Sequence, residues 1–441
     1  MTRLNMIATK NLRVHATIQT AWLLPNGAPG WITGLVIGLV LVLTKGPLAA
    51  ADLMRITATG DGQIVTVGAS SLLDLLEAAI EARDQFAGFR GFDRHLSLSY
   101  AGVRDAVTVD VTADETEAVL RIPITGFQRT FTGASSSDLQ DQIEDFFKKE
   151  GYTELKRFYK RIHQLSLVAV SDGNPNSGTG LAARQAYDRF ARSPGLTREE
   201  WDSPKDLRGV FSFGFMPQAG LIDAGDFSGY YVQLGLDLRF AFSQRVGLVL
   251  GLTPAMVSIE EAEAFYFDAN LGLPVKVLGR AGQPLSWTLT PFGNATASGS
   301  ADYVAGGLMV GGGLASLLTY DFGRVSLGMG NQISFHEGRD LKIADYHVDP
   351  GVSQQILKNG LQVSLPIGRR WVAQVYGIHT WLLQPAAIDD YFTVGGQLAY
   401  RLLGDPSSDR YRRGYLFIGV GADLAKDYTS PSVRLGNGWR F

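Results

Sequence analysis

The sequence predicts a two-domain protein in which a small α/β module is followed by a 12-stranded antiparallel transmembrane β-barrel. Two observations lead to this prediction. Residues 52–192 mix short strand patterns with amphipathic helices, whereas residues 207–441 contain twelve segments in which apolar and polar side chains alternate. In these segments the second face is small and sparsely charged, which favours a lipid-facing outside and a polar lumen over a solvated sheet.

The composition excludes several classes of protein. The 441-residue chain has a formal net charge of −3, so it lacks the strongly basic surface that nucleic-acid binding requires. It contains no cysteine, which removes disulfides, thiolate metal sites and cysteine nucleophiles. We expect no nucleic-acid partner, no cofactor and no bound metal.

Residues 1–51 have the layout of a secretory signal peptide. Basic residues precede the apolar run Trp31–Thr44, and the small residues Ala49–Ala51 offer a cleavage site before Asp52. A helix over this apolar run would rise about 21 Å, which is short of the roughly 30 Å hydrocarbon core of a bilayer. We therefore expect export with cleavage of this segment, and not a membrane anchor.

The module spans residues 52–192. Its expected elements are a strand at 53–58, a helix capped by Ser71, antiparallel strands within 95–103, 106–113 and 118–131, helices at 138–151 and 153–165, a turn-rich loop at 171–180 and a short helix at 181–190. A linker rich in charged residues and proline follows at 193–206. The two helices within 138–165 carry many basic residues, which could contact inner-leaflet headgroups or peptidoglycan, although a solvated helix face is the simpler interpretation.

The barrel spans residues 207–441. Its twelve strands are expected at about 207–216, 228–242, 245–257, 263–278, 284–297, 302–321, 324–336, 353–366, 369–382, 390–403, 412–424 and 427–441. Tight turns are expected after several even-numbered strands, and the longest connections are expected near 217–227, 337–352 and 383–389. An even strand number allows the sheet to close without free edges.

The chain ends in the octapeptide RLGNGWRF. Arg434, Gly436, Trp439 and Phe441 occupy the polar, glycine and aromatic positions of a pattern that resembles the C-terminal β-signal of bacterial outer-membrane β-barrels. The resemblance implies a porin-like barrel in the Gram-negative envelope, recognised by the barrel-assembly machinery and surrounded by outer-membrane lipid and lipopolysaccharide. It covers only the barrel half of the chain, and no family is recognised for the module. With both barrel termini in the periplasm, we expect the module there too.

Charged residues on the polar face of the strands are candidates for the lumen lining. They are Asp237, Arg239, Asp268, Lys276, Arg401, Asp423, Arg434 and Arg440. If water passes through the barrel, these mixed charges would tune its selectivity, and if it does not, they must form a buried network satisfied by internal partners.

One predicted loop gathers carboxylates and imidazoles. Residues 336–351 include His336, Asp340, Asp345, His347 and Asp349. Such groups could hold a divalent cation or act as a general base, although a solvated loop facing lipopolysaccharide is the simpler interpretation. The chain contains no Gly-x-Ser-x-Gly nucleophile motif, and we assign no catalytic residue.

The leading functional hypothesis from sequence is a small-pore channel for small polar solutes. The alternatives are a non-transport barrel that anchors an envelope-binding or assembly module, an autotransporter-like protein, and an outer-membrane lipid-modifying enzyme. The sequence does not establish enzymatic activity.

Overall fold

The computed structural model of the protein describes residues 52–440 with several gaps. The positions outside the description are 1–51, 83–84, 87, 90, 193–209, 280–282, 304, 324, 344–345, 369, 404–412 and 441. The predicted signal peptide and linker therefore lie outside the described residues.

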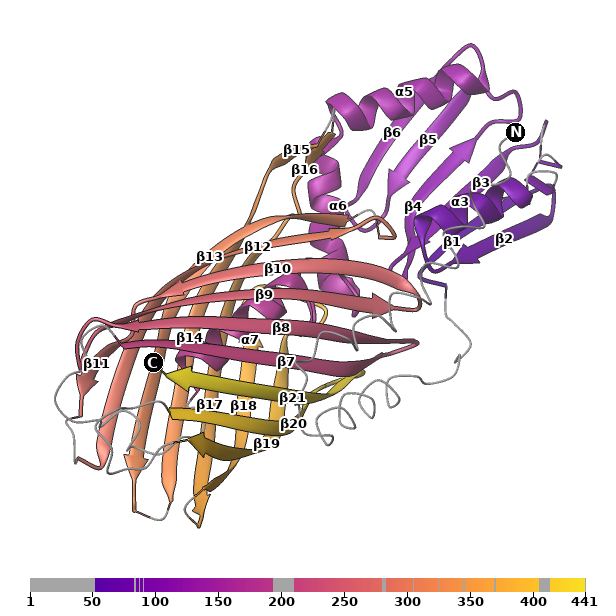
Figure 1. Ribbon diagram of the computed structural model, residues 1–441. Coiled ribbons are helices and arrows are strands. Elements are labelled where there is room, and N and C mark those ends of the chain that lie inside the picture. The colour runs from indigo at the N-terminus through magenta and orange to yellow at the C-terminus, as the bar shows by residue number, and fades with distance from the viewer. Residues whose placement is uncertain are drawn as a thin grey trace, which may run out of the picture. The chain divides into compact units, whose positions relative to one another are not determined.

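The C-terminal part of the chain is a closed antiparallel barrel (Figure 1). Its strands are β7 Val210–Ala224, β8 Phe227–Ala241, β9 Gly247–Ile259, β10 Ala262–Gly272, β11 Val275–Leu278, β12 Leu285–Ser300, β13 Ala305–Asp321, β14 Ser326–Arg339, β17 Ser353–Ile367, β18 Trp371–Leu382, β19 Asp390–Leu403, β20 Arg413–Ala425 and β21 Tyr428–Arg440. β10 and β11 are consecutive parts of one wall strand, because both pair with β12. β21 pairs with β7 and closes the ring. The predicted 12-stranded barrel is confirmed.

The first barrel strand is longer than the sequence indicated. The prediction placed a long loop at 217–227, whereas β7 continues to Ala224. This stretch contains Pro217 and Gly220, residue types that are common in turns, but both lie in the ladder with β8. At Gly220 an added Cβ would lie 2.5 Å from the ring of Tyr231, so the glycine makes room for a side chain of the neighbouring strand. Tertiary pairing therefore overrides the local turn signal.

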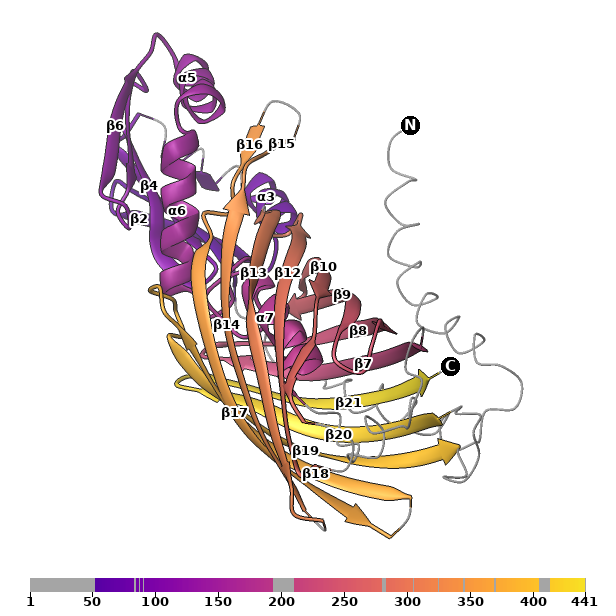
Figure 2. The ribbon, with the colours of Figure 1, turned by 90° about the vertical axis from the view of Figure 1, so that its left-hand side faces the viewer.

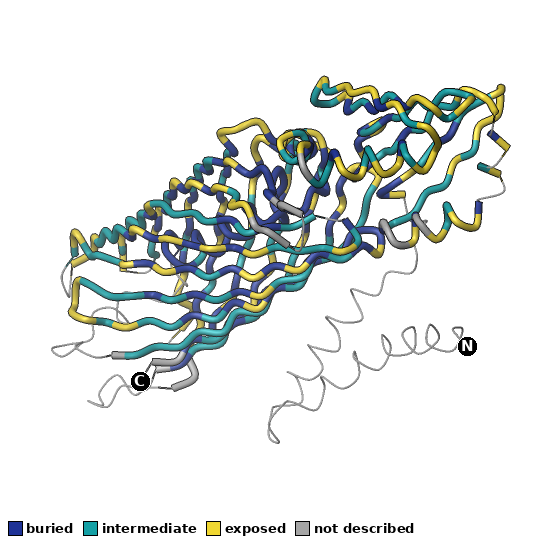
Figure 3. The backbone as a smooth tube through the Cα atoms, turned by 90° about the horizontal axis from the view of Figure 1, so that it is seen from above, coloured by how far each residue is buried: buried dark blue, intermediate teal, exposed yellow. Residues whose placement is uncertain are grey.

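The barrel has an apolar outer face and a polar inner face. Large apolar side chains such as Phe265 and Phe335 point outward and are 55% and 49% exposed. Polar side chains at alternate positions point inward and are buried, among them Asn270 and Gln332. Figure 3 shows this alternation of exposed and buried positions along the strands. The predicted division into a lipid-facing outside and a polar lumen is confirmed.

The N-terminal module contains a six-stranded antiparallel sheet in the order β2-β1-β3-β4-β5-β6. Its elements are β1 Met54–Gly60, β2 Gln63–Ala69, α3 Leu72–Glu81, β3 Arg94–Tyr100, β4 Val103–Val111, β5 Glu117–Ile122, β6 Phe127–Thr132, α5 Ser136–Lys149 and α6 Tyr152–Leu165. Ser71 caps α3 as predicted, because its hydroxyl accepts a hydrogen bond from the amide of Asp74. The sequence analysis missed β2, whose Ile64 is exposed. Among the described residues, no helix is long and apolar enough to span a membrane.

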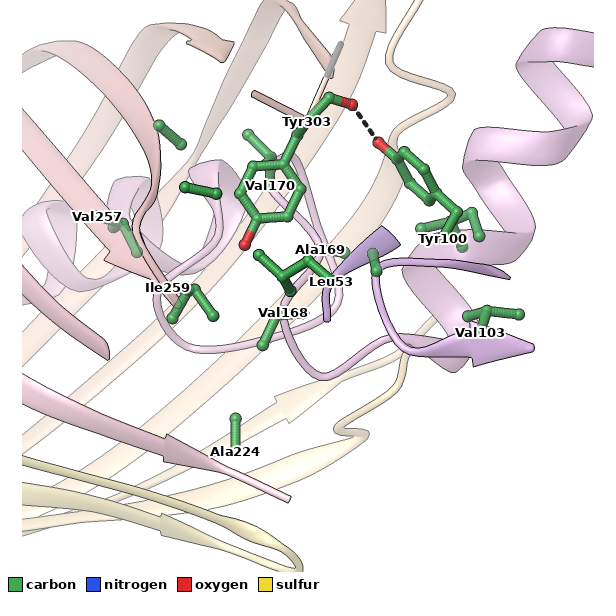
Figure 4. Packing of buried hydrophobic residues seen from close by; sticks show 14 of the residues in the cluster. Leu53, Tyr100, Val103, Val168, Ala169, Val170, Ala224, Val257, Ile259 and Tyr303 are labelled. Carbon is green, nitrogen blue, oxygen red and sulfur yellow. Dashed lines mark hydrogen bonds between the residues drawn. The ribbon is translucent and has the colours of Figure 1, made fainter. Parts of the chain in front are cut away.

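The module packs against one end of the barrel. The Tyr100 hydroxyl donates a hydrogen bond of 2.5 Å to the carbonyl oxygen of Tyr303, which lies between β12 and β13. Figure 4 shows this bond and the buried apolar residues around it, which come from both parts of the chain and form one cluster. In α6, the Lys156 ammonium forms an ion pair with the carboxylate of Asp349, in the connection between β14 and β17.

The helix predicted at 181–190 lies in the barrel lumen, and not beside the module sheet as the sequence suggested. This helix, α7 Gly178–Phe190, packs against β10, β12, β13, β14 and β17 (Figures 1 and 2). Twelve of its 13 residues are buried. Its sequence lacks a broad apolar stripe because the barrel wall, and not a single sheet face, covers it on several sides.

The module and the barrel's own termini lie at opposite ends of the barrel. β7 begins and β21 ends at one end, which we call the terminal end. Tyr303, Asp349 and Ala387, which contact the module, lie in connections at the other end, which we call the module end. The connection with Asp349 also carries a small hairpin, β15 Leu341–Ile343 and β16 Tyr346–Val348. The sequence analysis expected both the barrel termini and the module in the periplasm, and that expectation stays a prediction.

Candidate functional site

A buried stretch of chain, residues 166–192, fills the lumen, and we call it the plug segment. It enters at the module end and carries α7 toward the terminal end. Ser177 caps α7 with a hydroxyl that accepts a hydrogen bond from the Gly180 amide. The turn before the helix is satisfied internally, since Asn174 donates to the carbonyl of Ala169 and accepts from the Asn176 amide. A buried turn can leave no backbone group unpaired, and these bonds meet part of that requirement.

The first ion pair between plug and wall joins Arg184 to Asp423 of β20. The side chains of both residues are less than 10% exposed. The other donors of the guanidinium reach the hydroxyl of Tyr231 at 3.2 Å and the amide oxygen of Asn176 at 3.3 Å. The arginine is therefore paired and hydrogen-bonded, as a buried charge must be to avoid a large desolvation cost.

The second ion pair lies deeper in the lumen and involves Arg189. Its Nε atom is 2.5 Å from Oδ1 of Asp237 in β8. Nη2 donates a hydrogen bond of 2.7 Å to the hydroxyl of Thr253, and Nη1 lies 3.9 Å from Oδ2 of Asp268. The Arg189 side chain is 0% exposed, so these wall groups, and not water, stabilise its positive charge.

The third group of charges surrounds Asp188, the least buried residue of α7. Nη1 of Arg192 lies 3.2 Å from Oδ1 of Asp188, and Nη1 of Arg434 lies 3.5 Å from Oδ2. Arg434 also donates to the hydroxyl of Tyr376, while the Arg192 guanidinium stacks 3.8 Å above that ring and donates to Gln397. In these three groups, charges of the plug lie next to opposite charges of the wall.

Glycines in the wall make room for the plug. An added Cβ at Gly251 would lie 2.2 Å from Nε of Arg189, and one at Gly330 would lie 2.1 Å from the carbonyl oxygen of Ala191. At Gly360 the Cβ would meet the Tyr187 hydroxyl at 2.2 Å. These distances are too short for any side chain, so the wall is matched in shape to this segment.

Four of the predicted lumen residues contact the plug, namely Asp237, Asp268, Asp423 and Arg434. Arg239 also faces the lumen and pairs with Asp237 at 3.5 Å, but 30% of its side chain is exposed. Lys276 lies in β11 and is partly buried. Arg401 and Arg440 lie in β19 and β21, and their side chains lie outside the described residues.

The sequence analysis missed the plug side of this network. Arg184, Asp188 and Arg189 lie in the short helix predicted at 181–190 of the module, and neither they nor Arg192 were named as site residues. A usable signal was present, because Arg184 and Arg189 lie in a helix that has no clear apolar face, and Arg192 follows it closely. Such a helix is suited to a polar lumen with carboxylates on the wall.

The structure describes only part of the predicted cluster at 336–351, in which Asp340 and Asp349 both interact with Tyr152 of α6. His336 lies in β14, and not in a loop as predicted, because β14 extends to Arg339; its buried ring lies 3.2 Å from the Ser334 hydroxyl. Asp349 is buried and binds Lys156 of the module. Asp340 follows β14, and His347 lies in β16. Asp345 lies outside the described residues. Within the described part of the chain, no three His, Cys, Asp or Glu residues are grouped as a metal site.

Of the predicted assembly signal, three residues lie in the closing strand β21. Arg434 faces the plug, as described above. Gly436 leaves space for the ring of Phe417, which an added Cβ would approach to 2.3 Å. Trp439 pairs with Gly414 and Phe213 in the ladders on either side. Phe441 lies outside the described residues.

The closed ring of twelve wall strands carries an exposed apolar outer face and ends in the predicted signal. The chain folds as a closed β-barrel of the transmembrane type. No protein-family model matches it. No curated protein matches it either.

Solved structures with similar folds are outer-membrane barrels of several kinds. The translocator domain of the autotransporter NalP from Neisseria meningitidis has 13% identity and a TM-score of 0.38, over 60% of this chain and 97% of that one. An outer-membrane channel from Pseudomonas putida F1 has 12% identity and a TM-score of 0.39, over 56% and 100%. The NanC porin has 10% identity and a TM-score of 0.33, over 51% and 98%.

The contact between module and barrel contains a buried histidine, and this predicts a pH dependence. His163 of α6 is buried, its carbonyl oxygen accepts a 3.0 Å hydrogen bond from the Ala387 amide, and burial lowers its pKa to about 4. In the unfolded chain the pKa is near 6.5, so the unfolded state binds the proton first as the pH falls. Stability is therefore full above pH 6.5 and decreases by up to about 3 kcal/mol toward pH 4.

Thermal melting of the module at pH 7.5 and pH 5 measures this effect. The H163Q variant, which has no titrating ring at this position, should show a smaller loss between the two pH values. An equal loss in the two proteins would assign the pH dependence to other groups.

Proposed function

We propose that this protein is a closed outer-membrane barrel that holds its N-terminal module at the outer surface of the cell, with the plug segment as a tether through the lumen. The observation that carries the proposal is the path of the chain. The module contacts one end of the barrel, the plug segment fills the lumen, and the barrel strands begin and end at the other end.

Two arguments support this orientation. Barrels with an even number of strands have both termini on one side, and the resemblance of the C-terminal octapeptide to bacterial β-signals favours the periplasm for that side. The longest connection, which carries β15 and β16 and contains Asp349, is at the module end, and long connections in such barrels are extracellular. A periplasmic module would need the inverted barrel, with both barrel termini outside.

The alternative of a small-pore channel needs an aqueous path beside α7. The packing of the lumen supports a closed barrel instead, because 12 of the 13 helix residues are buried and their charges bind wall residues. Conduction would require the plug segment to leave, and so to break at least two buried ion pairs at once. In a stable tether, the same contacts hold the module at a defined end of the barrel.

Labelling on intact cells tests the orientation, and the absence of natural cysteine makes it simple. We place one cysteine in the module, T130C, and a matched one in the turn between β8 and β9 at the terminal end, Q244C; both native residues are exposed. A membrane-impermeant maleimide should label T130C on intact cells and Q244C only after permeabilisation. The reverse pattern would place the module in the periplasm.

A further inference from the structure

The module contains an apolar cavity that the tether function does not use. Its volume is about 700 Å³, within the range typical of small-molecule sites. Strands β1, β3, β4 and β5 form the floor, Phe86 and Phe89 form one side and α5 forms the other. The apolar residues that line it are Ile56, Ala58, Phe86, Phe89, Leu96, Val109, Val111, Ala118, Leu139 and Ile143.

The cavity exists because the two helices cover only the edges of the sheet. α3 packs on β1 and β2, and α5 packs on β6. Apolar side chains of the central strands therefore have no helix above them, and Leu96 and Val109 are only partly buried. Partly exposed apolar surface of this kind gains free energy when a ligand removes it from water.

Two charged residues line the cavity, Arg94 of β3 and Glu144 of α5, and Arg94 is the one basic residue of the lining. The Arg94 side chain is 16% exposed, and Nη2 forms an ion pair of 2.6 Å with Oε1 of Glu115. A guanidinium has five donors in a planar fork, so a second carboxylate can bind its other edge. Ser136, Gln140 and Glu144 are the other polar residues of the lining, and Glu144 forms an ion pair with Lys148.

We propose that this cavity binds a fatty-acid-like ligand, in which a single acyl chain lies over the central strands and a carboxylate binds Arg94. The apolar floor matches the chain, and a single partly buried cation matches one anionic group. A bilayer surface would need a flat or convex apolar patch, and here the apolar residues are concave. The site is independent of the orientation of the barrel in the membrane.

The test uses the full-length protein in lipid nanodiscs and a palmitate that carries a photoreactive diazirine on its chain. After irradiation, the labelled peptides are mapped by mass spectrometry. Labelling of peptides from β4 and α5 should reach a plateau as the probe concentration rises. The lipid-facing strands of the barrel report non-specific partition into the bilayer in the same sample, and their labelling should rise linearly with probe.

Two variants distinguish a specific binding site from non-specific apolar binding. V109W fills the cavity and should reduce labelling of the module about tenfold, whereas the matched control T130W, on the exposed outer face of the sheet, should leave it unchanged. R94Q should weaken labelling by the acid about tenfold, because the acid forms a charge-assisted hydrogen bond with Arg94. Labelling by the corresponding diazirine alcohol, which carries no charge, should hardly change.

The outcomes are distinct. Labelling that persists in V109W, or module labelling that rises linearly with probe like that of the barrel strands, would overturn the proposal. Equal loss of acid and alcohol labelling in R94Q would overturn the role of Arg94. Circular dichroism of each variant confirms that the module is folded, and T130W shows that a tryptophan on this sheet is tolerated.

Discussion

Replacing Arg189 with methionine is expected to destabilise the docked plug segment by about 3–5 kcal/mol, because it leaves buried carboxylates without their partner. Arg189 is 0% exposed and lies between Asp237 and Asp268. Methionine keeps most of the side-chain volume, so the loss reports the charge and not a cavity. The measurement is the urea midpoint of the barrel in detergent micelles, together with proteolysis within residues 166–192.

The matched control is R239M. Arg239 also pairs with Asp237, at 3.5 Å, but its side chain is 30% exposed. Solvent screens such a pair, and its loss should cost less than about 1 kcal/mol. Equal effects of the two substitutions would show that the buried network does not hold the plug. Adding D268N to R189M should restore part of the stability, since it removes the buried carboxylate that pairs with Arg189 at 3.9 Å.

Replacing Gly330 with alanine should also release the plug, by a steric mechanism. The added methyl group would lie 2.1 Å from the carbonyl oxygen of Ala191, which is backbone at the end of α7 and cannot rotate away. Overpacking of this kind costs about 1–3 kcal/mol. The urea midpoint and the rate of proteolysis within the plug segment should both change in the destabilising direction.

Gly328 provides the control on the same strand and the same face. Its added methyl group would meet only the side chain of Gln362, which is flexible. G328A should therefore change the urea midpoint much less than G330A. If the two variants behaved alike, the loss would come from alanine in the strand and not from contact with the plug.

The barrel could be predicted from sequence because its signal is local. Alternation along each strand depends only on which face meets lipid, and all twelve wall strands overlap the predicted segments. The main error, at β7, arose where Pro217 and Gly220 imitate a turn. Gly220 fits a close approach to Tyr231, which belongs to another strand and has no signature in the local pattern.

The site was predicted only in part, for the same physical reason. The wall charges Asp237, Asp268 and Asp423 were identified because strand alternation places them on the inner face. The plug residues that pair with these carboxylates were not identified, because the strands that bury α7 lie far away in sequence. A buried helix in a polar lumen needs no apolar stripe, so its sequence resembles that of a solvated helix. The docking role of Asp349 depends on Lys156, 193 residues earlier.

Single-channel recording in planar bilayers tests most directly whether the plug segment closes the lumen. The full-length protein should give no stable conductance, whereas a variant that lacks residues 178–190 should give discrete, reproducible steps. Folding of both proteins is established first by heat-modifiable migration on gels. Steady conductance of the full-length protein would contradict a closed barrel and favour the channel, and silence of the deletion variant would show that something other than α7 closes the lumen.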